Sequence, residues 1–256
     1  FESTTLSFGT AGTGGFAIVN SSIADYSLYT QIIIGVFMML FGINFNFYFL
    51  LFCGKLKAAF RNVEVKSYIG IMATSIILIA LNIRHMFGSF FEALHQSAFQ
   101  VSSVMTTTGY ATTDFDKWPV FSRTVMLIVM CVGACAGSTG GGFKVSRIVI
   151  LAKSAKRELK RLAHPRSVSV ITMDGKRISD EVVTGTNVFF FIYVVVFVVS
   201  LLIVSIDGKD MVTNISGVIA TLNNIGPGLG EVGPTGNFSD FSWYSKVVFI
   251  LDMLLG

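Results

Sequence analysis

Long stretches without Asp, Glu, Lys or Arg dominate the hydrophobic pattern of the chain. They run from Tyr26 to Gly54, from Ser67 to Ile83, from Thr124 to Phe143 and from Val182 to Ile206. A membrane-spanning helix needs about 20 mostly apolar residues, so each stretch is long enough, with 67–83 at the lower limit. A signal peptide would place one shorter apolar run at the N-terminus. The pattern therefore predicts an all-α integral membrane protein.

Composition supports this interpretation, because charge is scarce. Hydrophobic residues make up 52% of the chain, charged residues 13%, and the mean hydropathy is +0.69, whereas soluble domains carry about 25% charged residues. The net charge of +4 gives no reason to expect a nucleic-acid partner. Cys131 and Cys135 have i, i+4 spacing, but no histidine or carboxylate lies near them in the sequence. They and Cys53 are predicted to be small buried packing residues and not metal ligands.

Basic residues set the expected orientation. One basic segment follows the first apolar stretch, another follows Phe143, and the positive-inside rule places both in the cytoplasm. The chain between them then crosses the membrane twice and leaves 88–116 outside. Residues 97–113 carry no charge yet are too few to cross twice, which predicts a re-entrant loop. The basic residues are Lys55, Lys57, Arg61 and Lys66, then Lys153, Lys156, Arg157, Lys160, Arg161 and Arg166.

This unit of helix, re-entrant loop and helix recurs. The segment 101–109 aligns with 218–226 and with 7–15, and each is followed by a short polar stretch and an apolar helix. Repeats around an axis allow one chain to build a symmetric pore. Both ends of the sequence cut into the pattern, so we expect a fragment. The predicted units are 1–54 (end of a repeat), 67–160 (a complete repeat) and 182–256 (a shortened repeat), joined by cytoplasmic linkers 55–66 and 161–181.

The glycine and threonine residues of these loops suit an ion filter. Irregular backbone survives at membrane depth only where it lines water or packs in protein. Glycine adopts positive φ, so successive carbonyls can face one axis and replace the hydration shell of a monovalent cation. Ser89 and Glu92 form a capping-box pattern for a short helix ending near Met105, whose negative C-terminal end would favour a cation. The alternative for each segment is close helix packing through small residues, but recurrence at matching places favours a pore.

Five glycines interrupt the apolar run that starts at Thr124. Each costs up to about 1 kcal/mol against alanine in a helix, so a continuous helix is not expected. The break is interpreted as a gating loop below the filter, and the alternative is a kink that lets helices pack. A phosphate loop is excluded because Phe143 separates Gly142 from Lys144. Lys144 is expected to extend to the membrane interface or to hinder cations near the gate. The predicted gating residues are Gly133, Gly137, Ser138, Thr139, Gly140, Gly141, Gly142 and Lys144.

A basic amphipathic helix from Arg147 to Leu162 is followed by a predicted hairpin at 168–178, where Asp174-Gly175 favours a tight type I′ turn. This segment is either a linker held at an anionic membrane surface or a docking site for a regulatory subunit. His95 and Gln96, in the short helix before Met105, are expected to pack and to form hydrogen bonds, and not to bind a metal.

Two stretches resemble a known family. Thr106-Thr-Thr-Gly-Tyr-Ala-Thr-Thr-Asp-Phe115 and Gly133-Ala-Cys-Ala-Gly-Ser-Thr-Gly-Gly-Gly-Phe-Lys-Val-Ser-Arg147 are similar to the Trk/Ktr/HKT superfamily of potassium transporters, closest to its bacterial TrkH type, and the resemblance covers essentially the whole chain. It implies four helix–loop–helix repeats with pseudo-fourfold symmetry around one pore. This chain would hold the end of the second repeat, the third repeat and most of the fourth.

The resemblance also implies the site. One filter glycine per repeat gives Gly109, Gly226 and either Gly15 or Gly14, and 223–226 carries no threonine, as fourth repeats of the family often do not. It further implies a homodimer in lipid of the bacterial inner membrane, a cytoplasmic ring of nucleotide-binding regulatory domains as partner, and no covalent cofactor. The residues expected to hold K⁺ are Gly12, Thr13, Gly14, Gly15, Thr106, Thr107, Thr108, Gly109, Asn223, Asn224, Ile225 and Gly226.

Potassium uptake through a gated, carbonyl-lined filter is therefore the leading hypothesis. The alternative is a secondary symporter coupled to H⁺ or Na⁺, which would need inverted repeats and intramembrane carboxylates. The repeats here run parallel, and the apolar stretches hold almost no acids. A membrane enzyme would need an acid, base or metal cluster at depth. None is visible in the sequence, so no enzymatic activity is expected.

Overall fold

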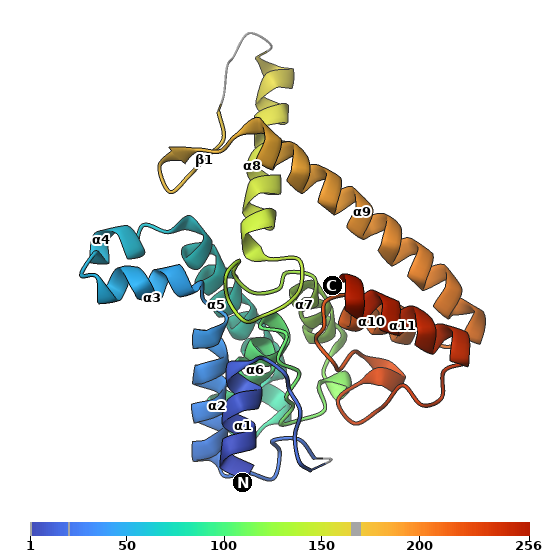
Figure 1. Cartoon of the computed structure of the whole chain (residues 1–256). Coiled ribbons are helices and arrows are strands. Elements are labelled where there is room, and N and C mark those ends of the chain that lie inside the picture. The colour runs from blue at the N-terminus through green and yellow to red at the C-terminus, as the bar shows by residue number, and fades with distance from the viewer. Residues whose placement is uncertain (1, 20, 165–169) are drawn as a thin grey trace.

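The computed structural model describes residues 2–19, 21–164 and 170–256, and within them the chain is helical apart from loops and one small hairpin (Figure 1). The helices are α1 (Glu2–Ala11), α2 (Leu28–Phe41), α3 (Phe45–Phe52), α4 (Leu56–Ala59), α5 (Val63–Ile83), α6 (Phe90–Met105), α7 (Val120–Met130), α8 (Val145–Ala163), α9 (Asp180–Val204), α10 (Met211–Leu222) and α11 (Trp243–Leu255). Short 3₁₀ turns are η1 (Arg84–Met86), η2 (Phe115–Lys117), η3 (Ser205–Asp207) and η4 (Gly230–Val232), and the strands are β1 (Thr172–Met173) and β2 (Lys176–Arg177).

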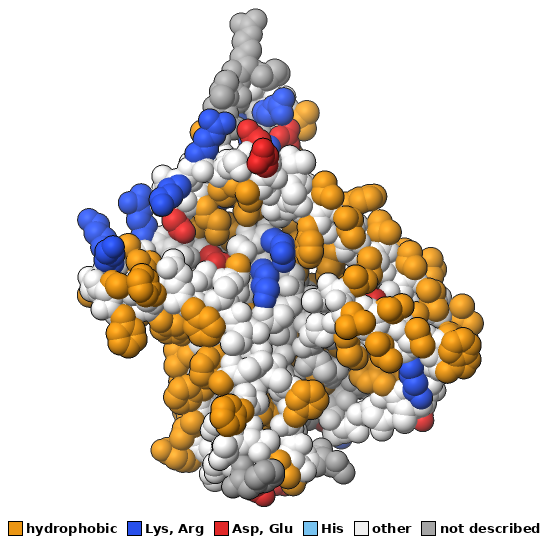
Figure 2. Space-filling view, in the orientation of Figure 1, with side chains coloured by type: hydrophobic (Ala, Val, Ile, Leu, Met, Phe, Trp, Pro, Cys, Tyr) orange, Lys and Arg blue, Asp and Glu red, His pale blue; other side chains and the backbone are white. Residues whose placement is uncertain are grey.

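Among the described residues, two continuous helices are long and apolar enough to cross a membrane. They are α5 extended by η1, and α9 extended by η3, and a third span results if α2 and α3 are counted as one bent pair. Figure 2 shows hydrophobic side chains over both flanks and most of the visible Lys and Arg side chains in the upper half. The predicted all-α membrane fold is confirmed. Exposed apolar residues of α9 include Val188, Phe191, Ile192, Val195, Val198 and Leu202.

The stretch from Tyr26 to Gly54, predicted as one span, is in fact two helices. α2 and α3 meet at an angle of 89°. The Asn44 side chain caps α3 by accepting from the Asn46 N–H at 2.8 Å, and the Phe45 N–H donates to the Gly137 carbonyl at 2.9 Å. Long-range contacts therefore end α2 where the apolar pattern alone would continue it.

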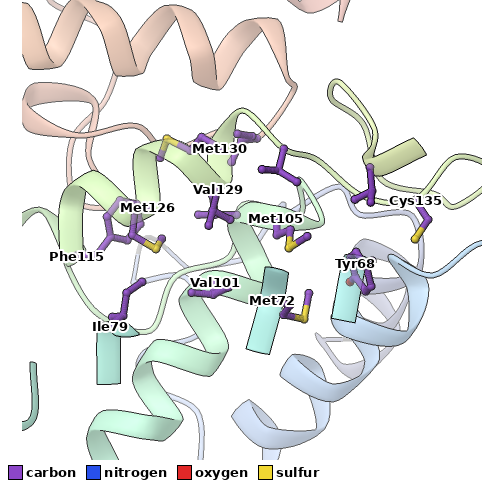
Figure 3. Close-up of a cluster of buried hydrophobic side chains, with 14 of the residues drawn as sticks. Tyr68, Met72, Ile79, Val101, Met105, Phe115, Met126, Val129, Met130 and Cys135 are labelled. Atoms are coloured by element: carbon purple, nitrogen blue, oxygen red, sulfur yellow. The ribbon is translucent and has the colours of Figure 1, made fainter. Parts of the chain in front are cut away.

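The main core lies where α5, α6 and α7 pack together (Figure 3). Its buried side chains surround the second half of α6 and hold the end of that helix in place. Several are methionines, whose flexible side chains fill irregular gaps between helices. The core includes Tyr68, Met72 and Ile79 of α5, Val101 and Met105 of α6, Met126, Val129 and Met130 of α7, together with Phe115 and Cys135.

Helices α6 and α10 are short and mostly buried, and both end inside the molecule. Ser89 caps α6 by accepting from the Glu92 N–H at 3.1 Å, as predicted, and Asp210 caps α10. Polar side chains of α6 bind the chain that returns from its end. Gln100 donates to the Thr113 carbonyl at 3.1 Å and Ser103 to the Tyr110 carbonyl at 2.5 Å. The return segment is thus fixed to the helix it follows.

The predicted hairpin pairs Thr172 with Arg177 and Met173 with Lys176, with Asp174 and Gly175 at φ 53° and 80° as a type I′ turn requires. The Asp174 carboxylate also accepts from the Val63 N–H at 2.7 Å, so the hairpin caps the start of α5. This contact brings the two basic segments to the same end of the molecule (Figure 1). Of the predicted features, Arg166 and residues 168–169 lie outside the described residues.

Gly42 tests the packing at the bend. A Cβ there would overlap the Tyr68 hydroxyl and lie 2.7 Å from Thr106 Cγ2, so Gly42→Ala should lower the free energy of unfolding by about 1–3 kcal/mol. The matched control is Gly70→Ala in α5. A Cβ there would meet no atom within 4 Å beyond the neighbouring backbone of its own helix, so alanine should be neutral or favourable. Both variants are purified in detergent and heated, and the fraction that remains monodisperse at each temperature gives the melting temperature. Equal melting temperatures for the two variants would contradict the packing described.

Candidate functional site

Helices α1, α6 and α10 end in the same backbone motif. The second residue after each helix has left-handed backbone, with φ between 50° and 58°, and the N–H of the next residue bonds to the carbonyl five residues earlier at 2.8–2.9 Å. A left-handed residue followed by such a bond is a Schellman motif, which provides partners for carbonyls that the helix end leaves free. The left-handed residues are Thr13, Thr107 and Asn224, and the bonds run from Gly14 to Gly9, Thr108 to Ser103 and Ile225 to Ala220.

A glycine with positive φ follows two residues after each left-handed residue. These are Gly15, Gly109 and Gly226, with φ of 65°, 86° and 107°. The predicted register in 12–16 was open between Gly14 and Gly15. The matched conformations place Gly15 in the same backbone position as the other two glycines. We refer to residues 12–15, 106–109 and 223–226 as the first, second and third loops.

The three loops are far apart in the sequence, but they contact one another at or beside their positive-φ glycines. A Cβ built on Gly15 would overlap the Thr108 carbonyl oxygen, and one on Gly109 would overlap the Ile225 carbonyl oxygen. A Cβ on Gly226 would lie 3.9 Å from Gly109 Cα. Thr106, Thr107 and Thr108 are buried, whereas the three glycines are partly or fully exposed. Backbone, rather than threonine side chains, therefore forms the accessible surface here.

Thr13 and Thr107 are unusual in having left-handed backbone. A β-branched residue in this region is strained, at a cost of about 1–2 kcal/mol, because its Cβ approaches the following carbonyl. Such strain persists where surrounding contacts fix the conformation. The Thr13 hydroxyl donates to the Thr139 carbonyl at 3.0 Å, and the Thr107 hydroxyl accepts from the Gly141 N–H at 2.6 Å. Both strained residues are thus held by the glycine-rich segment between α7 and α8.

That segment, residues 133–144, is called the glycine loop below. The predicted break in the helix is present: α7 ends at Met130 and α8 begins at Val145. The glycine loop lies against all three of the loops that follow α1, α6 and α10. A Cβ on Gly140 would lie 2.8 Å from the Thr106 carbonyl oxygen, and one on Gly141 would lie 3.1 Å from that of Asn223. The contacts join Thr139 to the first loop, Gly140 and Gly141 to the second, and Gly141 and Gly142 to the third.

Comparison with known proteins gives the family. A family model described as TrkH, cation transport protein, matches residues 2–256. The chain belongs to the TrkH family. It is 36% identical over 260 residues to the Trk system potassium uptake protein TrkH of Escherichia coli K12, covering 100% of this chain and 53% of that protein. It is 30% identical to the Trk system potassium uptake protein TrkG of the same strain, covering 100% of this chain and 53% of that protein.

A solved structure agrees with these relatives. The crystal structure of the potassium transporter TrkH from Vibrio parahaemolyticus superposes with a TM-score of 0.90 at 37% identity, covering all of this chain and 55% of that one. This TrkH-family chain therefore spans about half the length of the relatives that it matches. The family resemblance noted from 106–115 and 133–147 is confirmed.

The side chains of Lys144 and Arg147 fold back onto neighbouring groups of the protein. The Lys144 ammonium donates to the Gly140 carbonyl inside the glycine loop, and Arg147 donates to the Phe143 carbonyl at 3.0 Å. The Arg147 guanidinium also stacks on Phe189 of α9, 4.0 Å from the ring centroid. Both charges fold back because backbone carbonyls and an aromatic face lie within reach. They line a cavity of about 270 Å³ between the glycine loop and α9.

Sequence reasoning missed two residues of this TrkH-family site. Glu64, at the start of α5, is 3% exposed and accepts hydrogen bonds from the glycine loop. It lies within a basic segment, between Arg61 and Lys66, so the pattern gave no sign that it is buried. Tyr193 of α9 accepts from the Asn223 side-chain amide at 2.8 Å, beside the third loop. A single tyrosine among the valines and phenylalanines of an apolar stretch was the only available signal for it.

Other predicted residues have local roles. His95 forms a hydrogen bond to Gln31 at 2.9 Å, and Gln96 accepts from the Thr112 hydroxyl at 2.6 Å, as expected of packing residues. The three cysteines are free; Cys135 is buried and Cys131 partly buried, whereas Cys53, just after α3, is exposed and is not the buried packing residue predicted for it. The described residues contain no group of three His, Cys, Asp or Glu side chains suited to a metal. Outside the spans, a 2.6 Å hydrogen bond to Glu231 raises the pKa of Lys209.

The contact between the second loop and the glycine loop can be tested with Thr107→Val. Valine keeps the shape of threonine but leaves the Gly141 N–H without its acceptor, at a cost of about 1–3 kcal/mol. Hydrogen–deuterium exchange of a peptide covering 137–144 should become about tenfold faster or more. Thr124→Val, which removes only an exposed bond within α7, should leave that exchange unchanged. Slow exchange in both variants would show that Thr107 does not hold the glycine loop.

Proposed function

We propose that this chain forms three of the four sides of a potassium uptake pore in the bacterial inner membrane, with the first, second and third loops as its selectivity filter. One observation carries the proposal: three loops with the same backbone motif meet at a positive-φ glycine. Such backbone presents carbonyl oxygens that replace the hydration shell of a monovalent cation. The relatives named as potassium uptake proteins support K⁺ as the ion.

The electrostatics of the helix ends support a cation rather than an anion. α1, α6 and α10 each have their C-terminal end at one of the three loops. The C-terminal end of a helix carries a partial negative charge, which stabilises a cation placed near it. An anion site would instead use helix N-termini. The filter we propose comprises Gly12, Thr13, Gly14 and Gly15, then Thr106, Thr107, Thr108 and Gly109, then Asn223, Asn224, Ile225 and Gly226.

The repeats follow from the same motif. We propose that residues 1–54, 67–160 and 182–256 are successive pore repeats joined by the linkers 55–66 and 161–181. In this division α1, α2 and α3 belong to the first of them, α5 to α8 to the next, and α9 to α11 to the last, with the ends of α5, α8 and α9 extending a few residues into the linkers. Each contributes one Schellman-terminated helix and one loop. A fourth such repeat would complete the pseudo-fourfold ring.

We propose further that the glycine loop is the gate. It contacts all three candidate filter loops, and it is the segment in which glycines interrupt the apolar run. Gly133, Gly137 and Gly142 have positive φ, so the loop uses conformations that other residues adopt at a cost. Lys144, bonded back to Gly140, places a positive charge in the loop. That charge would oppose a cation while the loop is closed. Swinging the loop away would clear the exit from the filter.

The partners we propose are lipid, a second copy of the subunit and a cytoplasmic ring of nucleotide-binding domains. The basic end of α8 with the β1–β2 hairpin is the natural docking place for the ring. The hairpin is fixed there, since Lys153 donates to the Thr172 carbonyl at 2.6 Å and Ile150, Ile171 and Val183 are buried together. Because the hairpin is fixed to α8, movement of a partner bound to the hairpin would move α8 and, through it, the glycine loop that precedes α8.

Gly109→Ser tests the filter. A serine Cβ would overlap the Ile225 carbonyl oxygen at a position with φ 86°, so the loop must change shape. We expect the preference for K⁺ over Na⁺ to fall about tenfold or more, measured by ⁸⁶Rb⁺ uptake with Na⁺ competition in liposomes containing the full-length protein. Gly185→Ser, in open space on α9, is the matched control. Unchanged flux and selectivity in Gly109→Ser would exclude 106–109 as the filter.

Deleting Gly140–Gly142 tests the gate. The deletion removes the contacts of the glycine loop with the second and third loops, which should destabilise the closed arrangement by about 1 kcal/mol or more. Basal ⁸⁶Rb⁺ flux should therefore rise several-fold. Selectivity should remain, because the candidate filter glycines are untouched. A correctly folded deletion variant that does not transport would instead favour the interpretation of the break as a structural kink.

A further inference from the structure

A buried carboxylate lies at the base of the glycine loop. Glu64 is in the first turn of α5, outside the three candidate filter loops, and is 3% exposed. The rest of the buried face of α5 packs apolar side chains such as Met72 and Ile79 into the main core. A buried acid requires hydrogen-bond donors, since its desolvation is otherwise unfavourable. The position of those donors is informative.

Two of the donors flank the tip of the glycine loop, Ala136 within the loop and Ser146 in the first turn of α8 just after it. Glu64 Oε1 accepts from the Ala136 N–H at 2.6 Å and from the Ser146 N–H at 3.2 Å. Its other oxygen, Oε2, accepts from the Asn44 side-chain amide at 3.5 Å. One oxygen atom therefore joins the chain entering the tip of the loop to the chain leaving it. The same side chain also connects both to the bend between α2 and α3.

The start of α8 depends on this side chain. Lys144 occupies the N-cap of α8 but provides no side-chain cap, and Ser146 is the second residue of the helix. Free N–H groups in the first turn of a helix need acceptors, and a carboxylate there also interacts favourably with the helix dipole. Glu64 supplies both effects from a different helix. Hydrogen bonds to a charged acceptor are among the stronger ones in proteins.

The base and the tip of the glycine loop are held differently. At the base, backbone bonds of 3.0 Å join Cys135 to Gly42 and Val145 to Ala134, beside the Glu64 contacts. At the tip, the contacts with the candidate filter are one hydrogen bond donated by the Thr13 hydroxyl, one accepted by the Thr107 hydroxyl, and close packing of glycines. Such a tip can leave its place while the base stays fixed. Its position when closed is set by where the base holds it.

We infer that Glu64 is a positioning residue for gating: it clamps the two ends of the glycine loop so that the tip reaches the candidate filter loops. This inference rests on the gating role proposed above for residues 133–144. Without the carboxylate, the ends of the loop separate, the tip loses its register with Thr107, and the closed arrangement becomes less populated. The candidate filter keeps its shape, because Glu64 does not touch it.

The test measures the loop and the flux separately. Cys135 is buried at the base of the glycine loop, whereas Cys53 is exposed and Cys131 partly exposed. A full-length transporter with Cys53→Ser and Cys131→Ala, and with any cysteines outside these 256 residues also replaced, therefore reports release of the loop base through the rate at which a methanethiosulfonate reagent modifies Cys135. In this background Glu64→Ala should raise both the modification rate and basal ⁸⁶Rb⁺ flux about tenfold, with K⁺/Na⁺ selectivity unchanged.

Two further variants make the result decisive. Glu64→Gln keeps the volume and one acceptor oxygen, so it should give smaller changes in the same direction, and it replaces Glu64→Ala if that variant does not fold. Glu181→Ala removes an exposed glutamate from the first turn of α9 and should change nothing. Cys135 reactivity equal to that of the parent in the Glu64 variants would overturn the clamp. Raised reactivity with unchanged flux would overturn the gating role of the glycine loop itself, and with it the effect on gating inferred for Glu64.

Discussion

Backbone that leaves a helix within a membrane must find partners for its own N–H and C=O groups, and the rest of this structure depends on how it does so. α1, α6 and α10 each use a Schellman motif with a left-handed residue, Thr13, Thr107 or Asn224. The motif turns the chain sharply, satisfies the last carbonyls of the helix and leaves the next glycine beside its counterpart from another loop. The meeting of the three loops is thus a consequence of how three helices end.

The glycine loop and the candidate filter form one hydrogen-bonded unit. Strain at Thr13 and Thr107 is offset by bonds to the glycine loop, and the glycine loop is in turn held at its base by Glu64. Neither part is fully satisfied alone. Displacement of the glycine loop would leave the hydroxyls of Thr13 and Thr107 without these partners, while the Schellman bonds that shape the candidate filter loops stay in place.

Sequence reasoning gave the apolar stretches, the repeated glycine segments, the cap at Ser89 and the turn at Asp174-Gly175, because each depends on local chemistry. It gave the break between α7 and α8 for the same reason. It failed where contacts with residues distant in the sequence determine the conformation or the burial of a residue. The bend after Gly42 places that glycine against Tyr68 and Thr106, and the burial of Glu64 depends on donors from the bend itself, the glycine loop and α8. Which of Gly14 and Gly15 corresponds to Gly109 and Gly226 could be decided only from backbone angles, because two adjacent glycines look alike in the sequence.

The glycine loop comes from a single stretch of chain, yet it contacts three neighbours that belong to different parts of the sequence. A pore made from four identical subunits must usually move four equivalent elements together to open. A pore made from one chain has no such obligation, because its quadrants are free to diverge. In the pore proposed for this chain, one repeat carries a gate that contacts its own filter loop and the loops of two other repeats. Opening of that gate would move a single segment without concerted motion of several, so the steepness of the response would depend on what acts on the glycine loop and not on the number of repeats.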